Sequence, residues 1–341
     1  MATEKSLHIE KAMSENADIV HTPVLLAETL EHLAFDSAEK GFMVDSTLGE
    51  GGHSFAFLER FENLSIIGLD ADAEIQKRAK KRLAQFGDRM QFFNGWFNDF
   101  YANYPQELPQ PDRILFDLGI SVFHYECSGR GFSFRSQENL DMRLDSGKFN
   151  DATCFQGKYT GQTVEDLVNN LPENELADIL FYFAEERYSR RIARAVAAKR
   201  QQEPIATAKE LADCIYHAVP APYRHGAIHP ATKSFQALRI AVNGELERLE
   251  SVLKDAFNVL RVGGKMGVIS FHSLEDRIVK KYFQHLAKHC TCPPEQPICI
   301  CVGKPKATIL TRKPIVAGKE EIKMNAPSRS AKLRVIQKRE F

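Results

Sequence analysis

The stretch Phe42-Met-Val-Asp-Ser-Thr-Leu-Gly-Glu-Gly-Gly-His-Ser54 decides the fold of this chain. Its first residues are apolar and predict the end of a short buried strand, and residues 54–60 predict the first helix beyond it. Between them, Gly49, Gly51 and Gly52 make a tight turn. A strand, a glycine-rich turn and a helix bring bare backbone close to a bound ligand. The stretch therefore predicts a pocket for a nucleotide-like molecule.

Two acidic residues narrow the choice of ligand. A second expected strand, 65–70, ends in Asp70, about twenty residues after the glycines, where a carboxylate can accept hydrogen bonds from a ribose diol. Asp45 directly precedes the turn, where it would repel the pyrophosphate of a dinucleotide and attract the sulfonium and ammonium groups of S-adenosylmethionine. We therefore expect S-adenosylmethionine rather than NAD. The alternative is that Asp45 and Ser46 only cap the turn.

Alternating strands and helices continue from this stretch and predict a parallel, doubly wound α/β sheet. The expected strands are 42–44, 65–70, 90–94, 113–121 and 265–272, with 309–316 and 332–337 as a closing antiparallel pair, and the expected helices include 21–33, 72–86 and 245–260. Ligands bind beyond the carboxyl ends of such strands. Asp45, Asp70 and Asp117 each end a strand, so we expect the three carboxylates at one edge. Phe97 follows the third strand and either stacks on adenine or packs in the core.

Length and composition bound the class of protein. The chain has 341 residues, enough for one large α/β domain and a smaller insertion. It is 43% apolar and 26% charged, which is ordinary for a soluble globular protein. No apolar run is long enough to span a bilayer, and residues 1–17 lack a secretory apolar core. We expect a cytoplasmic protein with no membrane partner and a flexible extension over residues 1–20.

The α/β pattern is interrupted in the middle of the chain. Residues 128–135 and 140–145 show no clean period and predict a long ordered loop. Residues 163–218 read as helices, with the capping pattern of Thr163 and Asp166 at one helix start. We therefore expect residues 21–125 and 232–341 to form one discontinuous sheet domain. Residues 126–231, a loop plus helices, are expected to be an insertion into that domain.

Basic residues are unevenly distributed although the formal net charge is zero. From Lys304 onward there are eleven basic and three acidic residues, so this segment carries an excess of eight positive charges. A polyanion near this face is one interpretation, and an edge strand protected by lysines is the other. Arg187, Arg190, Arg191 and Arg194 have the spacing of one helix face. They either contact a nucleic acid or pair with acids such as Glu185 and Glu186.

Four cysteines form two C-x-C pairs near the carboxyl end. They are Cys290, Cys292, Cys299 and Cys301. Four thiolates this close can hold a tetrahedral zinc, although C-x-x-C is the commoner spacing. Reduced thiols and disulfides are the alternatives. We expect no metal, with the cysteine site as the weaker alternative.

Eight motifs occur in order along the chain. They are His21-Thr-Pro-Val-Leu-Leu26, Asp45-Ser-Thr-Leu-Gly-Glu-Gly-Gly-His-Ser54, Asp117-Leu-Gly-Ile-Ser121, Arg130-Gly-Phe-Ser-Phe-Arg135, Leu140-Asp-Met-Arg143, His229-Pro-Ala-Thr-Lys-Ser-Phe-Gln-Ala-Leu-Arg-Ile-Ala-Val-Asn243, Ser270-Phe-His-Ser-Leu-Glu-Asp-Arg277 and Ser330-Ala-Lys-Leu-Arg334. Together they resemble the bacterial RsmH (MraW) family over nearly the whole chain. The resemblance implies a class I S-adenosylmethionine-dependent methyltransferase sheet with a helical insertion. It also implies N4-methylation of a cytidine in the decoding centre of 16S ribosomal RNA, within the small ribosomal subunit.

The resemblance also implies site residues. The cofactor site would comprise Gly51, Gly52, His53, Asp70, Phe97 and Asp117, together with Asp45 from the reasoning above. The family often has Gln in a Ser-Ser-Pro-Gln run after the Asp117 position, and here that run is Ser121-Val-Phe-His124, so His124 stands where Gln is usual. We expect the base pocket to be lined by Arg130, Phe132, Arg135, His272 and Arg277.

Asp117 is the candidate catalytic residue. Cytidine N4 is a poor nucleophile because its lone pair is delocalised, and a carboxylate that accepts an N4 hydrogen localises the pair and then takes the proton. Two other functions compete with an RNA methyltransferase. A nicotinamide-dependent oxidoreductase would bind NAD, and a non-catalytic RNA-binding ribosome assembly factor would bind RNA without a cofactor. The sequence leaves the oligomeric state open, with a homodimer as one option.

Overall fold

The computed structural model describes residues 22–35, 40–135, 137–145, 157–226, 228–289 and 303–340. The expected N-terminal extension, residues 1–20, and the two C-x-C pairs lie outside these ranges. The chain forms two compact units. Met1–Ile120 and Leu249–Phe341 form the first, named here the sheet unit, and Ser121–Arg248 form the second, named the helical unit.

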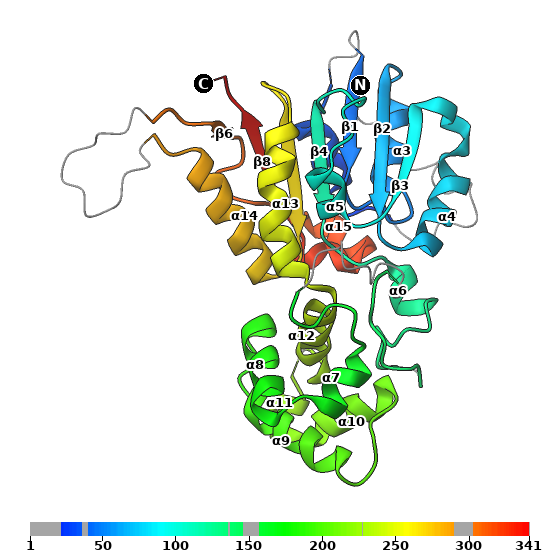
Figure 1. Cartoon of the computed structure of the whole chain (residues 1–341), viewed down its shortest axis with the longest axis vertical. Helices are drawn as coiled ribbons and strands as arrows, with labels where there is room; N and C mark the ends of the chain where they lie inside the picture. The colour runs from blue at the N-terminus through cyan, green and yellow to red at the C-terminus, as the bar shows by residue number, and fades with distance from the viewer. Residues whose placement is uncertain are drawn as a thin grey trace, which may run out of the picture. The chain divides into compact units, whose positions relative to one another are not determined.

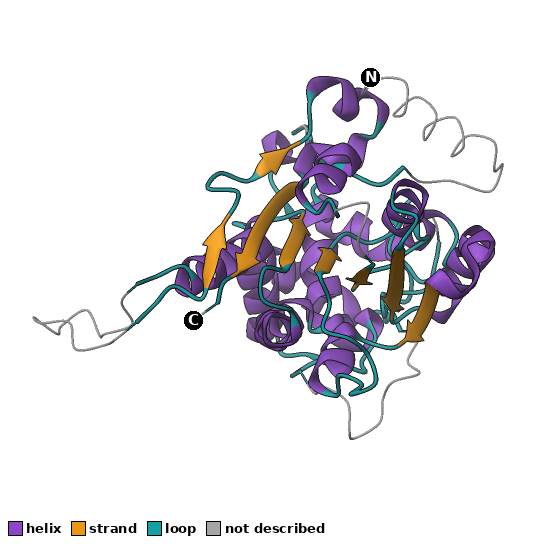
Figure 2. Ribbon diagram, turned by 90° about the horizontal axis from the view of Figure 1, so that it is seen from above, coloured by secondary structure: helices purple, strands orange, loops and turns teal. Residues whose placement is uncertain are grey.

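The sheet unit is built on one sheet of eight strands, with the order β3-β2-β1-β4-β5-β8-β6 and β7 also paired with β8 (Figures 1 and 2). The strands are β1 (Gly41–Asp45), β2 (Leu64–Asp70), β3 (Met90–Asn94), β4 (Arg113–Asp117), β5 (Lys265–Ser270), β6 (Ala307–Ile309), β7 (Ile315–Val316) and β8 (Lys332–Lys338). The first five strands are parallel, and β8 runs antiparallel to β5. This arrangement is the expected doubly wound α/β sheet with a reversed strand near one edge.

The closing pair of strands differs from the expectation in one respect. Residues 309–316 do not form a single strand, because β6 and β7 are separate short strands that both pair antiparallel with β8. Pro314 lies between them and has no N–H to donate to a ladder. The Thr311 hydroxyl accepts the backbone N–H of Val335 instead, at 2.8 Å. The segment between β6 and β7 therefore remains hydrogen-bonded to β8, although the regular ladder between them is interrupted.

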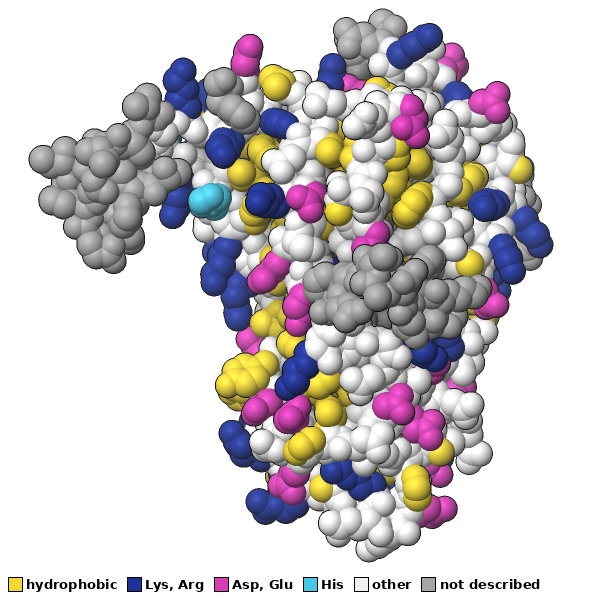
Figure 3. Space-filling model, in the orientation of Figure 1, with side chains coloured by type: hydrophobic (Ala, Val, Ile, Leu, Met, Phe, Trp, Pro, Cys, Tyr) yellow, Lys and Arg dark blue, Asp and Glu magenta, His cyan; other side chains and the backbone are white. Residues whose placement is uncertain are grey.

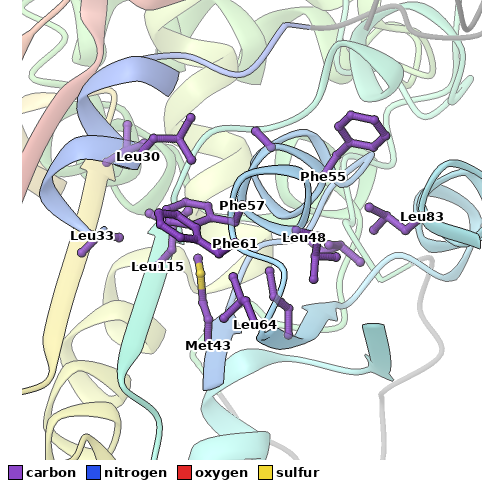
Figure 4. Close-up of a cluster of buried hydrophobic side chains, with 14 of the residues drawn as sticks. Leu30, Leu33, Met43, Leu48, Phe55, Phe57, Phe61, Leu64, Leu83 and Leu115 are labelled. Carbon is purple, nitrogen blue, oxygen red and sulfur yellow. The ribbon is translucent and has the colours of Figure 1, made fainter. Parts of the chain in front are cut away.

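Helices cover both faces of the sheet (Figure 2). They are α2 (Leu26–His32), α3 (Gly52–Arg60), α4 (Ala73–Leu83), η1 (Ala84–Arg89), α5 (Phe97–Ala102), the end of α13 (Glu245–Val259), α14 (Ser273–Leu286), α15 (Lys319–Met324) and η2 (Ala326–Ser330). Met43 on β1 packs with α2 and α3, whereas its neighbour Val44 packs with α5 and α13. Successive side chains of a strand point to opposite faces of the sheet, so β1 contributes to both apolar layers. Figure 4 shows the first layer, with Phe57 and Phe61 beside Leu115 and Met43.

The first helix begins later than expected. The sequence predicted a helix over 21–33 with Pro23 near its first turn, but α2 begins only at Leu26. Leu25 has φ 51°, a left-handed conformation that a continuous helix does not contain. Its side chain is fully buried, and its N–H donates to Glu321 Oε1 at 2.7 Å. A contact with a residue far along the chain therefore sets this helix start.

The helical unit consists of helices and one long ordered loop. Its helices are α6 (Val122–Glu126), α7 (Val164–Asn170), α8 (Glu173–Ala184), α9 (Ser189–Arg200), α10 (Ala208–Ala218), α11 (Ala221–Arg224), α12 (Ala231–Asn243) and the start of α13. The predicted capping box of Thr163 and Asp166 is present at the start of α7. The unit extends beyond the expected insertion, 126–231, at both ends. It continues beyond residue 231 because α12 packs against α8, a helix of the same unit.

The loop before α7 is held by its own side chains. Arg130 donates to the carbonyl oxygens of Arg143 and Leu144, at 2.8 and 3.1 Å. The Asn243 amide bridges two backbone groups of the same loop, donating to Met142 O and accepting from Leu144 N. Hydrogen bonds thus hold the described part of the loop up to residue 145, which has no regular secondary structure. In the described part of the chain, no helix is both long and apolar enough to cross a membrane.

Phe57→Ala should destabilise the sheet unit strongly. The Phe57 ring is fully buried and packs against Phe35 and Phe61, at centroid distances of 6.5 and 6.0 Å. Its removal leaves a cavity, and we expect a loss of about 3–5 kcal/mol in the free energy of unfolding. Phe181, which is 51% exposed, is the matched control, and its change to alanine should cost under about 0.5 kcal/mol. Chemical denaturation checks both values, and similar losses would contradict the assignment of Phe57 to the core.

Candidate functional site

The glycine turn after β1 is shaped by close packing. Gly49 and Gly51 have φ values of 54° and 77°, which residues with a side chain rarely adopt. A Cβ at Gly51 would lie 2.7 Å from Leu83 Cδ1, and one at Gly52 would lie 2.3 Å from Pro23 Cγ. At Gly49 a Cβ would meet no atom within 4 Å. Two of the glycines therefore let α3 approach its neighbours, and the third presents bare backbone to open space.

Asp70, at the end of β2, binds the same turn. Its Oδ2 accepts the Gly49 N–H at 2.8 Å, and its Oδ1 accepts the Asp72 N–H at the same distance. Burial is the main cause that raises the pKa of Asp70 to about 7, against the lowering effect of these two bonds. Each carboxylate oxygen has a second lone pair. Asp70 can therefore hold the turn and accept a hydrogen bond from a ligand at the same time.

Asp45, at the end of β1, is enclosed. It is 1% exposed, and its Oδ2 accepts the Ser54 hydroxyl at 2.6 Å while Oδ1 lies 3.4 Å from the Thr47 N–H. Burial raises the pKa of Asp45, and the Ser54 hydrogen bond and the nearby His53 oppose this shift. Asp45 thus joins the turn to the first residues of α3. These are the contacts expected if Asp45 caps the turn, which was the alternative role in the sequence analysis. The Asp45 carboxyl group also lies at the carboxyl edge of the sheet.

Buried His53 and partly exposed Asp117 form a pair beside the turn. His53 Nε2 lies 3.5 Å from Asp117 Oδ2, and His53 is 5% exposed. Three buried atoms of this pair have no hydrogen-bond partner within the described ranges. They are both ring nitrogens of His53 and Oδ1 of Asp117. Buried polar atoms are seldom left without partners, because each costs about 1–3 kcal/mol. The Asp117 oxygen fits a ligand group that donates a hydrogen bond or carries a positive charge, whereas the N–H of the His53 ring fits a group that accepts one.

Two hydroxyl residues of the turn have roles that the sequence did not predict. Thr47 Oγ1 accepts the backbone N–H of Asp117 at 2.6 Å, so it fixes the end of β4 beside the turn. The hydroxyls of Ser46 and Tyr101 are 2.8 Å apart and buried, and burial raises the pKa of Tyr101 well above 10. The one feature of the sequence that pointed to Ser46 and Thr47 was that they directly follow Asp45. Nothing in the sequence pattern showed which distant element each would contact.

Phe97 lies at the first residue of α5. Its ring is half-buried and makes edge contacts with Trp96 and Phe116, at centroid distances of 6.3 and 5.7 Å. It belongs to the layer of the core that α5 and α13 cover. Core packing, one of the two roles that the sequence allowed, is therefore present. The half-exposed ring remains compatible with the other role, stacking on a base.

The structure places the remaining candidates in different units. His124, in α6 of the helical unit, is 5% exposed and packs edge-on against Phe132 at 5.2 Å. Arg130 is engaged with the loop carbonyls, whereas Arg135 is exposed. In the sheet unit, His272 caps α14, and the exposed Arg277 lies one turn further along. Asp45, His53, Asp70 and Asp117 are thus the predicted residues that converge on one edge of the sheet unit.

Comparison with known proteins decides the family. The sequence model of the MraW methylase family matches residues 18–339. A protein of Treponema denticola is 55% identical over 94% of this chain and 98% of its own length. A second, from Treponema pallidum, is 41% identical over 98% and 97% of the two chains. Both are named ribosomal RNA small subunit methyltransferase H.

The chain belongs to the MraW methylase family. The predicted family and the predicted methyltransferase activity are thereby confirmed, and S-adenosylmethionine as the methyl donor follows from them. The α/β class is confirmed by the observed sheet. Among solved structures, an rRNA methylase from Streptococcus thermophilus aligns over 94% of this chain and 99% of its own. Its TM-score is 0.38 and its identity 8%, values too low to add to the assignment.

Asp70→Asn should change how stability depends on pH. In the folded protein the pKa of Asp70 is about 7, against 3.8 for an ordinary aspartate, so the folded state holds an extra proton between these values. The free energy of unfolding therefore falls as pH rises through this window. Asparagine does not ionise, so we expect the wild-type protein to lose stability relative to the variant between about pH 4 and about pH 7.

Thermal unfolding of the ligand-free proteins at a series of pH values measures this difference. Asp88→Asn, which changes an exposed aspartate of the same unit, is the control and should follow the wild type. A constant difference between the wild type and Asp70→Asn would show that Asp70 titrates normally.

Proposed function

We propose that the protein transfers a methyl group from S-adenosylmethionine to N4 of a cytidine in the decoding centre of 16S ribosomal RNA, as a cytoplasmic enzyme. The observation that carries the proposal is the set of carboxylates Asp45, Asp70 and Asp117 around a glycine turn, in a chain of a methylase family. The names of the relatives support the small ribosomal subunit as the substrate.

The residues of the sheet edge suit a cationic methyl donor. The buried, unpartnered Oδ1 of Asp117 and the enclosed charge of Asp45 favour a positive ligand over a pyrophosphate. Asp70 can accept hydrogen bonds from a ribose diol. The bare backbone at Gly49 allows a ligand to approach closely, and Gly51 holds the turn in its left-handed conformation beside it. His53, Gly52, Phe97 and His124 complete the proposed cofactor site.

The chemistry needs alignment and one proton acceptor. S-adenosylmethionine supplies an electrophilic methyl group on a sulfonium. The protein holds N4 of cytidine in line with it, since displacement at carbon requires that geometry. Asp117 accepts a hydrogen of N4, which localises the lone pair on nitrogen, and then receives the proton. His53, 3.5 Å from Asp117 Oδ2, limits the orientations that this carboxylate can take.

Substrate recognition is assigned to the helical unit and to α14. A cytidine in structured RNA has to be unstacked before it can enter a pocket. Exposed Arg135 of the helical unit and exposed Arg277 of the sheet unit each offer a guanidinium to an RNA phosphate. Phe132 and Arg130 hold the loop, and His272 holds the start of α14. In this proposal residues 126–231 provide the RNA-recognition part.

A methylation assay tests the function. Small ribosomal subunits that lack the modification are incubated with the protein and S-adenosylmethionine, and nucleosides of the digested RNA are read by mass spectrometry. N4-methylcytidine at a single decoding-centre position is the expected product. Affinity for RNA with no methyl transfer would instead support the non-catalytic assembly factor. A calorimetric titration with S-adenosylmethionine and with NAD tests the oxidoreductase, which requires NAD to bind.

Asp117→Asn should reduce turnover far more than cofactor affinity. Asparagine keeps the size of the side chain but is a much weaker proton acceptor, so we expect turnover to fall by about 10²–10⁴-fold. Single-turnover methylation and calorimetry measure the two quantities, with exposed Asp88→Asn as the control variant. Equal losses in turnover and affinity would reduce Asp117 to a binding residue.

A further inference from the structure

The junction of α8 and α9 in the helical unit exposes a mixed aromatic and basic surface. Phe181 and Tyr182, in the last turn of α8, are 51% and 64% exposed and contact one another at a ring distance of 5.2 Å. Arg187 lies in the turn between the helices, and Arg190 and Arg191 lie in the first turn of α9, all three exposed. We call these five residues the α8–α9 corner. Figure 3 shows hydrophobic and basic side chains exposed in this region.

The arginines of this corner are not neutralised by the acids next to them. Glu186 is fully buried and accepts hydrogen bonds from the Tyr223 hydroxyl and the Tyr188 N–H, at 2.7 and 2.9 Å. The nearest ion pair joins Arg194, one turn further along, to Glu173 at 3.7 Å. Arg187, Arg190 and Arg191 have no ion pair within the described ranges. Pairing with neighbouring acids, one of the two interpretations of the sequence, therefore applies to Arg194, and no ion pair of the described residues accounts for the other three.

The placement of these charges is unfavourable for the protein alone. Arg190 and Arg194 are four residues apart on α9, and like charges at this spacing repel one another. The first turn of α9 contains no acidic residue, and cations are disfavoured there by the helix dipole. A bound polyanion would relieve both effects.

The corner is also rigid. Glu185 ends α8 in a left-handed conformation, and its N–H and that of Glu186 return to carbonyl oxygens of α8. The Arg187 guanidinium lies over the rings of Tyr188 and Tyr223, at 4.8 and 4.9 Å. A surface already held in one geometry loses little conformational entropy when a partner binds. These features suit recognition of a folded partner.

We propose that the α8–α9 corner binds an unpaired segment of the ribosomal RNA, with the arginines on phosphates and Phe181 and Tyr182 stacked on bases. Phosphate binding gives the arginines their counter-charge, and bases without a pairing partner stack on exposed aromatic side chains. The inference rests on the proposed function in taking ribosomal RNA as the substrate. It adds a contact that anchors the RNA through the helical unit, apart from the residues that hold the cytidine.

The charge component is tested with Arg190→Gln combined with Arg191→Gln. The matched control combines Lys158→Gln with Lys209→Gln, two exposed lysines of the same unit that are already paired with Glu175 and Asp213. We expect KM for small subunits to rise about tenfold or more in the arginine variant. The slope of log affinity against log salt should become shallower by about 1.5, since each phosphate contact contributes about 0.7–0.9. The lysine control should leave both unchanged.

The stacking component is tested with Phe181→Ala combined with Tyr182→Ala. Loss of one stacked base should weaken binding by about tenfold, without a change in salt slope. Ile228→Ala is the control, because Ile228 is a 63% exposed apolar residue of the same unit. Both corner variants should keep the wild-type affinity for S-adenosylmethionine. The melting temperature of the arginine variant should be at or above that of the wild type, because like charges are removed. That of the aromatic variant should be close to the wild type, because both rings are exposed.

Three outcomes would overturn the inference. Corner variants that methylate subunits with wild-type KM and salt slope would remove its basis, as would a drop in melting temperature that accounts for the lost activity. Weaker binding to assembled subunits with unchanged binding to protein-free 16S RNA would show that the partner is a ribosomal protein. If the wild-type protein methylates no subunit, the proposed function itself fails, and protein-free RNA binding still tests the corner.

Discussion

The Gly49 N–H donates to the Asp70 carboxylate, and this hydrogen bond joins the end of β2 to the turn after β1. The rest of the sheet edge depends on the position of this turn. Because Gly51 takes a left-handed conformation, α3 begins at the next residue and brings His53 beside Asp117. Thr47 of the same turn binds the backbone of Asp117 from the other side. One short turn thus fixes the ends of three strands, β1, β2 and β4.

The same edge concentrates negative charge where the protein offers little to balance it. Burial raises the pKa of both Asp45 and Asp70, so a second charged carboxylate in this region is costly. A ligand with positive charge offsets that cost, whereas a phosphate increases it. This electrostatic preference is the physical link between the acids and a sulfonium donor. It also explains why the site is formed by strand ends, where side chains leave the apolar core.

The helical unit shows the opposite charge pattern, with repulsion kept on an exposed surface. Among the residues that the structure describes, Arg187, Arg190 and Arg191 have no ion-pair partner, and buried Glu186 helps to fix the corner on which they lie. A protein gains no stability from such an arrangement, since neighbouring like charges repel one another. Binding of a polyanion would offset the repulsion between these arginines, and this would explain their arrangement. Acids at the sheet edge and arginines at the α8–α9 corner thereby match the two charged molecules of the proposed reaction, a cationic donor and an RNA.

Local sequence determined the elements and the family. Short apolar runs marked β1 to β5, and the Thr163 and Asp166 pattern marked the start of α7, because buried strands and helix caps depend on residues only a few positions apart. The motifs around Asp45 and Asp117 were enough to predict the methyltransferase family. Tertiary structure alone decided where α2 begins, because a hydrogen bond from Leu25 to Glu321 sets it. It also decided that Thr47 holds Asp117 and that Glu186 is buried with Tyr223, since each of these contacts joins residues dozens or hundreds of positions apart that no local pattern relates.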